Sequence, residues 1–478
     1  MKYCEGSRAN KMFDALKEEC GVFGIYSKTG QIDVSRYVYY GLITLQHRGQ
    51  ESAGIATYND KKISYYKEMG LVREVFNNEN IFSMLDGNIG LGHVRYSTTG
   101  DSLSHNAQPL VVSYKGGSIA LAHNGNLINA LALREELEDT GSTFQTTIDS
   151  EVIAKLIAKA YPKQGFKNAI KDACNKIKGA FALGIICEDK LIGVRDPNGL
   201  RPLSIARLKD GYVLSSETAA FSVVGAERIR DVLPGEMVII DENGIDSVMY
   251  AEKIEKTTCS FEYVYFARPD TVIDNIGVYE TRIRLGKILA QNDDVHADVV
   301  MSVPDSGTVS AIGYAEERGI PFREGLLKNK YLGRTFIAPT QEERELLVQL
   351  KLAVLQGNVA GKNIVLLDDS IVRGTTSKII IKMLRRAGAK SIHLRVSSPP
   401  VANSCFFGID TPDKEHLIGA NHSIEEINAM LGTDSLKFIT CDELKKAIGT
   451  HEICMACFNG VYPIDVPTDL KKLVFEER

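Results

Sequence analysis

Residues 366–377 read LLDDSIVRGTTS, and they stand where an apolar run gives way to a helical pattern. The run KNIVLL at 362–367 is typical of a buried strand, and a helix is expected from about 376 to 387, ended by Gly388. A strand followed at once by a helix is the repeating unit of parallel α/β sheets. Such sheets bind their ligands at the carboxyl ends of the strands, which is where this stretch falls.

The polar residues of this stretch suit a phosphorylated sugar. Adjacent Asp368 and Asp369 can hold ribose hydroxyls or an Mg²⁺ ion, and Gly374 lets the backbone approach a phosphate closely. A polar turn with an N-capping hydroxyl is the commoner fate of a lone acidic pair, but acids, glycine and hydroxyls together at one strand–helix junction favour a phosphate site. The hydroxyls and amides at the helix N-terminus, where anions bind well, come from Thr375, Thr376 and Ser377.

The rest of the second half repeats this alternation. Residues 297–303 read as another buried strand, a helix follows from about 309 and stops at Gly319, and 391–397 read as a third strand. Continuous apolar strands that alternate with helices predict an α/β domain whose parallel sheet is covered on both faces.

The first half has a different rhythm of short strands punctuated by glycine. Helical patterns interrupt these strands at about 150–161 and 166–178. Strands grouped with a few helices predict a layered α+β domain, and the change of rhythm puts the boundary between about 245 and 265. The strand-like runs are 21–26, 89–96, 118–122, 182–186 and 236–240.

Composition excludes several classes of function. The 478 residues, 44% of them hydrophobic, allow two or three domains with substantial cores. The net charge of -5, from 56 basic and 61 acidic residues, argues against a nucleic-acid-binding protein. No apolar run approaches the roughly 18 residues of a membrane span, and the charged N-terminus is unlike a secretory signal. We therefore expect a cytoplasmic protein without nucleic-acid or membrane partners.

Nine cysteines in a reducing compartment are more often buried thiols than disulfides. Cys454 and Cys457 differ, because a CxxC pair can bind zinc, anchor an iron–sulfur cluster or form a redox pair, and by spacing alone zinc is at least as good a choice. The sequence assigns no role to Cys4. Cysteines that read simply as buried thiols are Cys174, Cys187 and Cys441.

Cys20 opens the first strand-like run, in CGVFGI at 20–25. By itself it could be a buried cysteine in an ordinary strand. Together with four later segments, this run resembles the glutaminase domain of N-terminal-nucleophile amidotransferases. The four segments are LQHRGQESAG at 45–54, GHVRYST at 92–98, AHNGNL at 122–127 and TIDSE at 147–151.

The stretch at 366–377 closely resembles the phosphoribosyl pyrophosphate signature of type I phosphoribosyltransferases. This resemblance implies that Asp368 and Asp369 contact the ribose and Mg²⁺, and that residues 374–377 cradle the 5-phosphate. It also makes VPDSG at 303–307 the pyrophosphate loop and KNKYLGRT at 328–335 the loop that closes over the substrate, although a basic loop is usually only solvated surface. The further residues that it implicates are Asp305, Ser306 near the metal, Lys328 and Arg334.

With both halves combined, residues 20–465 resemble the amidophosphoribosyltransferases, which transfer ammonia from glutamine to phosphoribosyl pyrophosphate in the first committed step of purine synthesis. The resemblance implies both compounds as substrates, purine nucleotides as feedback inhibitors and a homotetramer. It implies four segments: a propeptide at 1–19, an N-terminal-nucleophile glutaminase domain of layered αββα architecture at 20–255, an α/β type I phosphoribosyltransferase domain at 256–465, and a tail at 466–478.

The resemblance assigns the glutaminase chemistry to Cys20, whose thiol attacks the carboxamide. A thiol of pKa about 8.5 is mostly protonated at neutral pH, so the α-amine freed by propeptide removal would serve as its base. Asn124 and Gly125 would form the oxyanion hole. Glutamine would be bound or ordered by Arg95 (α-carboxylate), Asp149 (α-ammonium) and Arg48.

One branch of this family carries a [4Fe–4S] cluster, and the resemblance extends to its ligands. It favours the cluster over zinc, in a structural and not a catalytic site. A cysteine after the glutaminase domain, one in an NSCFFGID segment and a late CxxC pair match Cys259, Cys405, Cys454 and Cys457.

Two rival classes share one half of this chain. Amidotransferases with a sugar-isomerase or ATP-pyrophosphatase domain share the glutaminase half, but the segment at 368–377 argues against both. Regulatory proteins that sense phosphoribosyl pyrophosphate carry a DNA-binding module where this chain has a glutaminase.

If the chain is an amidophosphoribosyltransferase, ammonia must avoid protonation in bulk water, so a closed path between the halves is expected.

Overall fold

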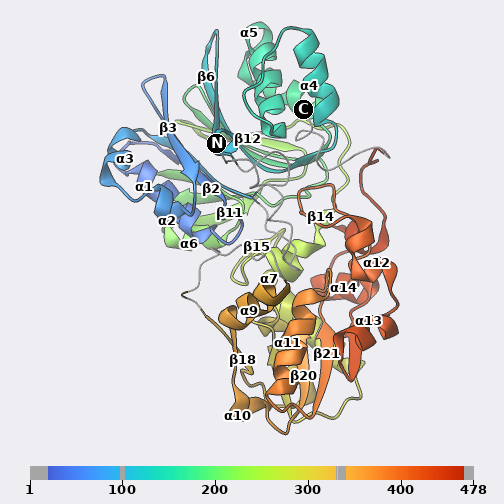
Figure 1. Ribbon diagram of the computed structural model, residues 1–478. Helices are drawn as coiled ribbons and strands as arrows, with labels where there is room; N and C mark the ends of the chain where they lie inside the picture. Colours follow the sequence, from blue (N-terminus) through green and yellow to red (C-terminus); the bar gives the residue numbers. More distant parts are fainter. Residues whose placement is uncertain (1–19, 97–102, 330, 332–340, 468–478) are drawn as a thin grey trace, which may run out of the picture.

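The computed structural model describes residues 20–96, 103–329, 331 and 341–467, with the backbone alone at 341–345. Figure 1 shows two bodies, a blue-to-green one above from the first half of the chain and a yellow-to-red one below from the second half. The expected propeptide with Cys4, most of the substrate-closing loop with Arg334, and the end of the tail lie outside the described residues.

The upper body contains two antiparallel sheets stacked face to face. Val22 and Leu91 from one sheet meet Ala122 and Ile186 from the other in a buried apolar cluster. In strand order, the seven-stranded sheet consists of β11 (Glu227–Asp231), β9 (Ser204–Leu208), β10 (Gly211–Ser215), β1 (Gly21–Ser27), β4 (Ile89–Arg95), β2 (Ser52–Asn59) and β3 (Lys62–Met69). The six-stranded sheet consists of β13 (Gly244–Met249), β12 (Glu236–Asp241), β8 (Lys190–Arg195), β7 (Gly179–Cys187), β6 (Gly117–Leu127) and β5 (Leu110–Tyr114).

Helices cover the outer face of each sheet. On the seven-stranded sheet they are α1 (Val34–Thr44), α2 (Val72–Val75), α3 (Glu79–Met84) and α6 (Ala219–Val223). On the six-stranded sheet they are α4 (Ala130–Asp139) and α5 (Asp149–Lys176). The expected αββα architecture is therefore confirmed, and the two helical patterns expected at 150–178 are the two parts of α5, which break at Gly165 with φ of +72°.

The lower body is built on a parallel sheet, as expected. Apolar side chains from its two faces enter separate buried clusters, one with α7, α8 and α14 and the other with α9, α11 and α13. The sheet runs β17 (Val299–Ser302), β20 (Asn363–Asp368), β21 (Ser391–Val396) and β22 (Ser435–Phe438). Its helices are α7 (Val278–Gln291), α8 (Thr308–Arg318), α9 (Gln341–Lys351), α11 (Thr375–Arg386), α13 (Ile424–Leu431) and α14 (Cys441–Ile448).

The end of the chain returns to the junction between the bodies. β14 (Thr258–Cys259) pairs in parallel with β23 (Ile453–Cys454), so Cys259 lies opposite Cys454. None of the described helices is long and apolar enough to cross a membrane. The remaining short elements are β15 (Val272–Ile273), β16 (Ile276–Gly277), β18 (Leu326–Lys328), β19 (Leu352–Val354), α10 (Gln356–Val359), α12 (Ile418–Asn421), α15 (Ala456–Asn459), η2 (Ser104–Asn106), η3 (Glu262–Phe266) and η4 (Lys414–His416).

Candidate active site

Cys20 lies directly before β1, the middle strand of the seven-stranded sheet, and its side chain is buried. Its Sγ lies 3.5 Å from the carbonyl oxygen of Tyr96. Burial raises the pKa of this thiol to about 11, although the hydrogen bond to Tyr96 and the positive charge of Arg95 oppose the shift. The thiol is therefore protonated at neutral pH and needs a base before it can attack.

Arg95 and Asp149, expected to bind glutamine, both lie close enough to act electrostatically on the Cys20 thiol. Arg95 ends β4, and Asp149 begins α5. The Asp149 carboxylate accepts hydrogen bonds from the Leu127 N–H at 3.0 Å and the hydroxyl of the adjacent serine at 3.3 Å. Burial raises the pKa of Asp149, but His123 and these hydrogen bonds outweigh it and hold the pKa below its usual value. One buried group of each sign suits the α-carboxylate and the α-ammonium of glutamine.

The expected oxyanion donors lie on β6, beside β4. His93 on β4 bonds the carbonyl oxygen of His123 at 3.0 Å and ties the two strands together there. Asn124 is buried, and its Nδ2 has no hydrogen-bond partner in the described part of the chain. Gly125 has φ of +147°, and a Cβ there would lie 2.0 Å from the carbonyl oxygen of Ala180, so only glycine fits. A buried donor without a protein partner is costly to keep and is available to negative charge that develops during a reaction.

Arg48 is fully buried behind Cys20. Its Nε donates to the Cys20 carbonyl oxygen at 3.1 Å, and its Nη1 donates to Glu217 at 2.7 Å. Nη1 and Nη2 also reach the Glu262 carboxylate, at 2.9 and 2.7 Å. This placement beside the nucleophile suits the expected ordering role. The sequence offered no signal for Glu217 or Glu262, because isolated acidic residues are usually solvated.

The expected sugar and metal ligands come together in the lower body, where β20 ends beside β17. Asp368 and Asp369 are both buried. Asp369 accepts hydrogen bonds from the hydroxyls of Ser306 and Ser370, the second at 2.5 Å. Burial raises the pKa of Asp369, and these hydrogen bonds and the charge of Arg282 oppose that rise.

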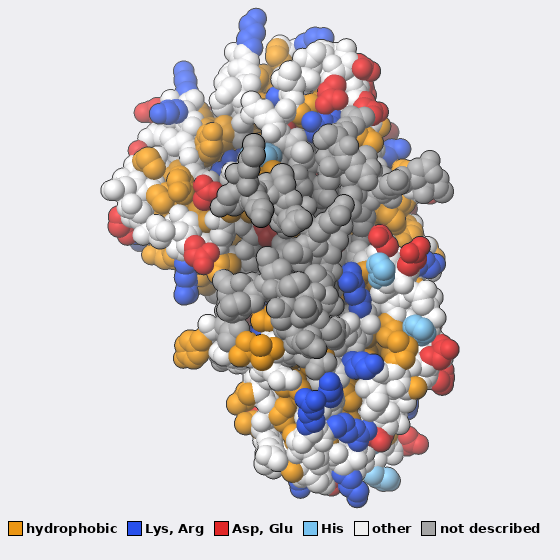
Figure 2. Space-filling view, viewed as in Figure 1, with side chains coloured by type: hydrophobic (Ala, Val, Ile, Leu, Met, Phe, Trp, Pro, Cys, Tyr) orange, Lys and Arg blue, Asp and Glu red, His pale blue; other side chains and the backbone are white. Residues whose placement is uncertain are grey.

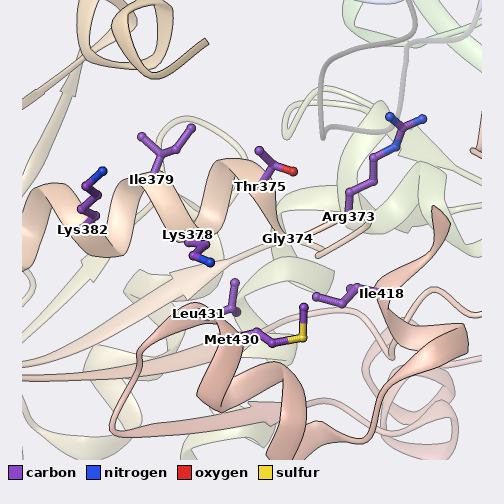
Figure 3. A pocket seen from close by; sticks show the side chains of 9 residues that line it. All are labelled: Arg373, Gly374, Thr375, Lys378, Ile379, Lys382, Ile418, Met430 and Leu431. Atoms are coloured by element: carbon purple, nitrogen blue, oxygen red, sulfur yellow. The ribbon is translucent and has the colours of Figure 1, made fainter. Parts of the chain in front are cut away.

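Gly374 directly precedes α11 as its N-cap and adopts the left-handed conformation, with φ of +80°. The first turn of the helix then presents Thr375, Thr376 and Ser377, as expected. A cavity of about 420 Å³ lies beside this turn (Figure 3), where Lys378 points toward Met430 and Leu431. Positive charge beside a helix N-terminus favours an anion such as phosphate. The cavity is lined by Arg373, Gly374, Thr375, Lys378, Ile379, Lys382, Ile418, Met430 and Leu431.

The two loops expected to bind pyrophosphate meet at an exposed ion pair. Lys328 Nζ lies 2.8 Å from Asp305 Oδ2, and Asp305 follows a cis peptide bond after Pro304. Arg334, expected to act with them, lies outside the described residues. Figure 2 shows Lys and Arg side chains gathered on this face of the lower body, in the region where Figure 1 places α11. The surroundings therefore suit a highly charged anion.

The four cysteines expected to bind a cluster lie at the junction of the two bodies. Burial raises the pKa of Cys454 to about 12 and that of Cys457 well above its usual value, and neighbouring cysteines add to both shifts. The Phe407 N–H donates to Cys405 Sγ at 3.3 Å. No three His, Cys, Asp or Glu side chains of the described residues already stand in an arrangement that could hold a metal ion. The four thiols are thus neighbours, but their side chains do not form a closed ligand set.

The segment that carries Cys405 also contacts β6, the strand of the expected oxyanion donors. Asn126 Nδ2 donates to the carbonyl oxygen of Phe406 at 2.9 Å, and Arg201 Nε donates to that of Phe407 at 3.0 Å. Gly408 packs so closely that a Cβ there would lie 3.3 Å from the Gly125 Cα. The lower body therefore contacts the glutaminase half immediately beside Gly125.

Known proteins match this chain over nearly its whole length. A family model described as a glutamine amidotransferase domain matches residues 93–223. The amidophosphoribosyltransferase of Archaeoglobus fulgidus is 49% identical over 453 residues, 94% of this chain and 98% of the relative. That of Bacillus subtilis is 50% identical over 461 residues, 95% of this chain and 96% of the relative.

Solved structures agree with the sequence comparison. The glutamine phosphoribosylpyrophosphate amidotransferase of Bacillus subtilis, complexed with ADP and GMP, superposes with a TM-score of 0.89 at 49% identity. The match covers 94% of this chain and 98% of that one. Both halves of the fold and both sets of motifs fall within it, and the chain belongs to the amidophosphoribosyltransferase family.

Proposed function

We propose that Cys20 is the glutaminase nucleophile and that the loop after β20 is the separate site where the sugar receives ammonia. The overall activity is that of the family: ammonia from glutamine replaces the pyrophosphate of phosphoribosyl pyrophosphate, giving phosphoribosylamine, glutamate and pyrophosphate in the first step of purine biosynthesis. The observation that carries the residue assignment is the buried Nδ2 of Asn124, which has no partner among the described residues and lies on a strand tied to the one that ends at Arg95.

In the first half-reaction Sγ of Cys20 bonds to the carboxamide carbon, and the oxyanion is stabilised by Asn124 and the Gly125 N–H. The thiol proton passes through the Cys20 α-amine to the departing ammonia, and water then hydrolyses the thioester to glutamate. Arg95 and Asp149 hold the charged end of glutamine. The buried thiol, whose pKa is raised to about 11, supports the need for such a base. Active protein should therefore begin at Cys20 by intact mass, and active protein that keeps Met1 would contradict the amine's role.

In the second half-reaction the ammonia nitrogen bonds to C1 of the sugar, the C1–oxygen bond to pyrophosphate breaks, and the nitrogen loses one proton to the departing pyrophosphate or to solvent. Residues 374–377 would hold the 5-phosphate, and Asp305, Lys328 and Arg334 the pyrophosphate. Mg²⁺ would be held by Asp368, Asp369 and Ser306, which fits an ion that takes one or two carboxylates and completes its shell with substrate oxygens. The metal would neutralise charge on the leaving pyrophosphate.

We propose a [4Fe–4S] cluster as the occupant of the cysteine site. Four thiols, one backbone N–H to sulfur and burial suit thiolate ligation of such a cluster. Loading would require the side chains to turn toward one centre, since they do not form a closed set as they stand. The cluster would tie the end of the chain to the junction of the two bodies. The ligands would be Cys259, Cys405, Cys454 and Cys457.

The regulation of this chain is proposed from a solved relative. Because a Bacillus subtilis relative was solved with ADP and GMP, we propose purine nucleotides as inhibitors of this chain. The homotetramer and the cytoplasmic location remain predictions from the sequence.

The experiment that tests the two-site assignment compares glutamine with ammonia as nitrogen source. Cys20→Ala should abolish pyrophosphate release with glutamine and leave the ammonia-dependent rate intact, because the sugar site is separate. Asp368→Asn should impair both rates. Loss of the ammonia-dependent rate in folded Cys20→Ala protein would contradict the two-site assignment.

A further inference from the structure

A buried group of four charged side chains lies behind the nucleophile. It contains two arginines and two glutamates, so its charges balance, and the four side chains are no more than 1% exposed. Arg48 bonds both carboxylates, and Arg201 Nη1 lies 3.7 Å from Glu262 Oε1. A buried ion group of this kind is costly to desolvate and weak as a source of stability, so a positional role is the better explanation. The group consists of Arg48, Arg201, Glu217 and Glu262.

Glu262 differs from the other three residues because it comes from the lower body. It is the first residue of η3, a short π-helix of the kind that is often found at functional sites. Arg282 holds this turn by donating to the carbonyl oxygens of Tyr263 at 2.9 Å and Ala267 at 2.8 Å. The backbone of Glu262 is thus held in the lower body, while its carboxylate binds the Arg48 guanidinium of the upper body.

The two carboxylates together fix how Arg48 meets the nucleophile. Glu262 binds Nη1 and Nη2, Glu217 binds Nη1 from the other side, and the remaining Nε donates to the Cys20 carbonyl oxygen at 3.1 Å. Glu217 is itself held by His47 at 2.7 Å and by the Thr271 hydroxyl at 2.9 Å. With both nitrogens of the fork engaged, the guanidinium has one orientation available.

We propose that Glu262 is a positioning residue for glutamine hydrolysis, supplied by the phosphoribosyltransferase half. It holds Arg48 in the orientation that bonds the Cys20 carbonyl oxygen, and so positions the nucleophile. The inference rests on the proposed role of Cys20. It implies that the glutaminase site is complete only when the lower body is docked. A displacement of about 1 Å at a reacting group can lower a rate about 100-fold.

The test is Glu262→Gln, which keeps shape and removes the charge. We expect kcat for glutamine hydrolysis to fall about 10- to 100-fold, KM for glutamine to stay within about twofold, and the ammonia-dependent rate to stay within about twofold. Glu262→Asp keeps the charge but is too short for both bonds, and it should recover part of kcat. Because Glu262 acts through Arg48, Arg48→Met combined with Glu262→Gln should be no slower than Arg48→Met alone.

The matched control is Asp274→Asn, which breaks a separate buried ion pair between the bodies, Arg195 to Asp274 at 2.8 Å, without touching Arg48. It should leave the ratio of glutamine- to ammonia-dependent rates unchanged. Equal loss of both rates in Glu262→Gln, a wild-type rate, or the same ratio change in Asp274→Asn would overturn the proposal. If Glu262→Gln does not fold, the ratio of glutamine- to ammonia-dependent rates in Glu262→Asp tests the proposal instead. Glutamine hydrolysis by Cys20→Ala would instead overturn the nucleophile assignment, whatever Glu262 does.

Discussion

Replacement of Asn124 by alanine tests whether its amide nitrogen stabilises the transition state. The Nδ2 has no partner in the described part of the chain, so the substitution breaks no hydrogen bond between that atom and the described residues. In the tetrahedral intermediate the same N–H would donate to an oxyanion. Loss of one such donor typically lowers kcat about 100- to 1,000-fold, or about 2.7–4 kcal/mol. We expect a loss of this size in glutamine hydrolysis.

The thermal stability of Asn124→Ala should stay close to that of the wild-type protein although its activity falls. An unsatisfied buried donor costs about 1–3 kcal/mol, and its removal offsets the packing that is lost when the side chain is shortened. The midpoint of thermal unfolding should therefore move by no more than about 4 °C. Because the proposed bond forms only in the transition state, kcat and kcat/KM should fall together while KM for glutamine stays constant.

Asn126→Ala is the matched control for this prediction. Its Nδ2 donates to Phe406 at 2.9 Å, so the substitution should cost about 1 kcal/mol of stability and change kcat little. The assays are glutamate release, ammonia-dependent pyrophosphate release and a thermal melt of each variant. A fall in kcat of less than about fivefold in Asn124→Ala, roughly 1 kcal/mol, or a change confined to KM would refute the oxyanion assignment.

Three further predictions concern backbone, charge and metal. Gly125→Ala should lower both glutaminase activity and thermal stability, because its Cβ would lie 2.0 Å from the Ala180 carbonyl; a wild-type melting curve would contradict the close approach. Burial raises the pKa of Asp274, but Arg195 and Thr258 leave it lowered to about 2 against about 3.9 in the unfolded chain. Its ionised form therefore contributes about 2–3 kcal/mol to the free energy of unfolding above pH 4, and this contribution is lost as the pH falls toward 2. In Asp274→Asn the free energy of unfolding should depend less on pH between these values. Anaerobically purified protein should be brown with about four irons per chain and Cys405→Ser should lose them, whereas a colourless, fully active preparation with one zinc would reject the cluster.

The sequence by itself determined the local architecture and the local chemistry. The strands expected at 297–303, 362–367 and 391–397 are β17, β20 and β21, because buried parallel strands are continuous apolar runs. The stop of α8 at Gly319 was also predictable, since glycine adopts the left-handed conformation there at φ of +62°. Helix α1 was missed, although Asp33 caps its start and the buried Val34, Val38 and Leu42 recur at helical spacing. Its small and polar residues, such as Ser35 and Thr44, are buried by packing against the sheet.

Only the tertiary structure decided how the two halves support one catalytic centre. Glu262 and Arg48 are 214 positions apart, and no periodicity or spacing connects them; they meet because the fold brings the start of η3 against the buried guanidinium. Asn126 meets Phe406 across 280 positions for the same kind of reason. A side chain's local sequence shows its chemical type, but whether a buried carboxylate faces a guanidinium or water depends on which surfaces the fold brings together. The partners of the nucleophile were therefore decided by the docking of the two bodies.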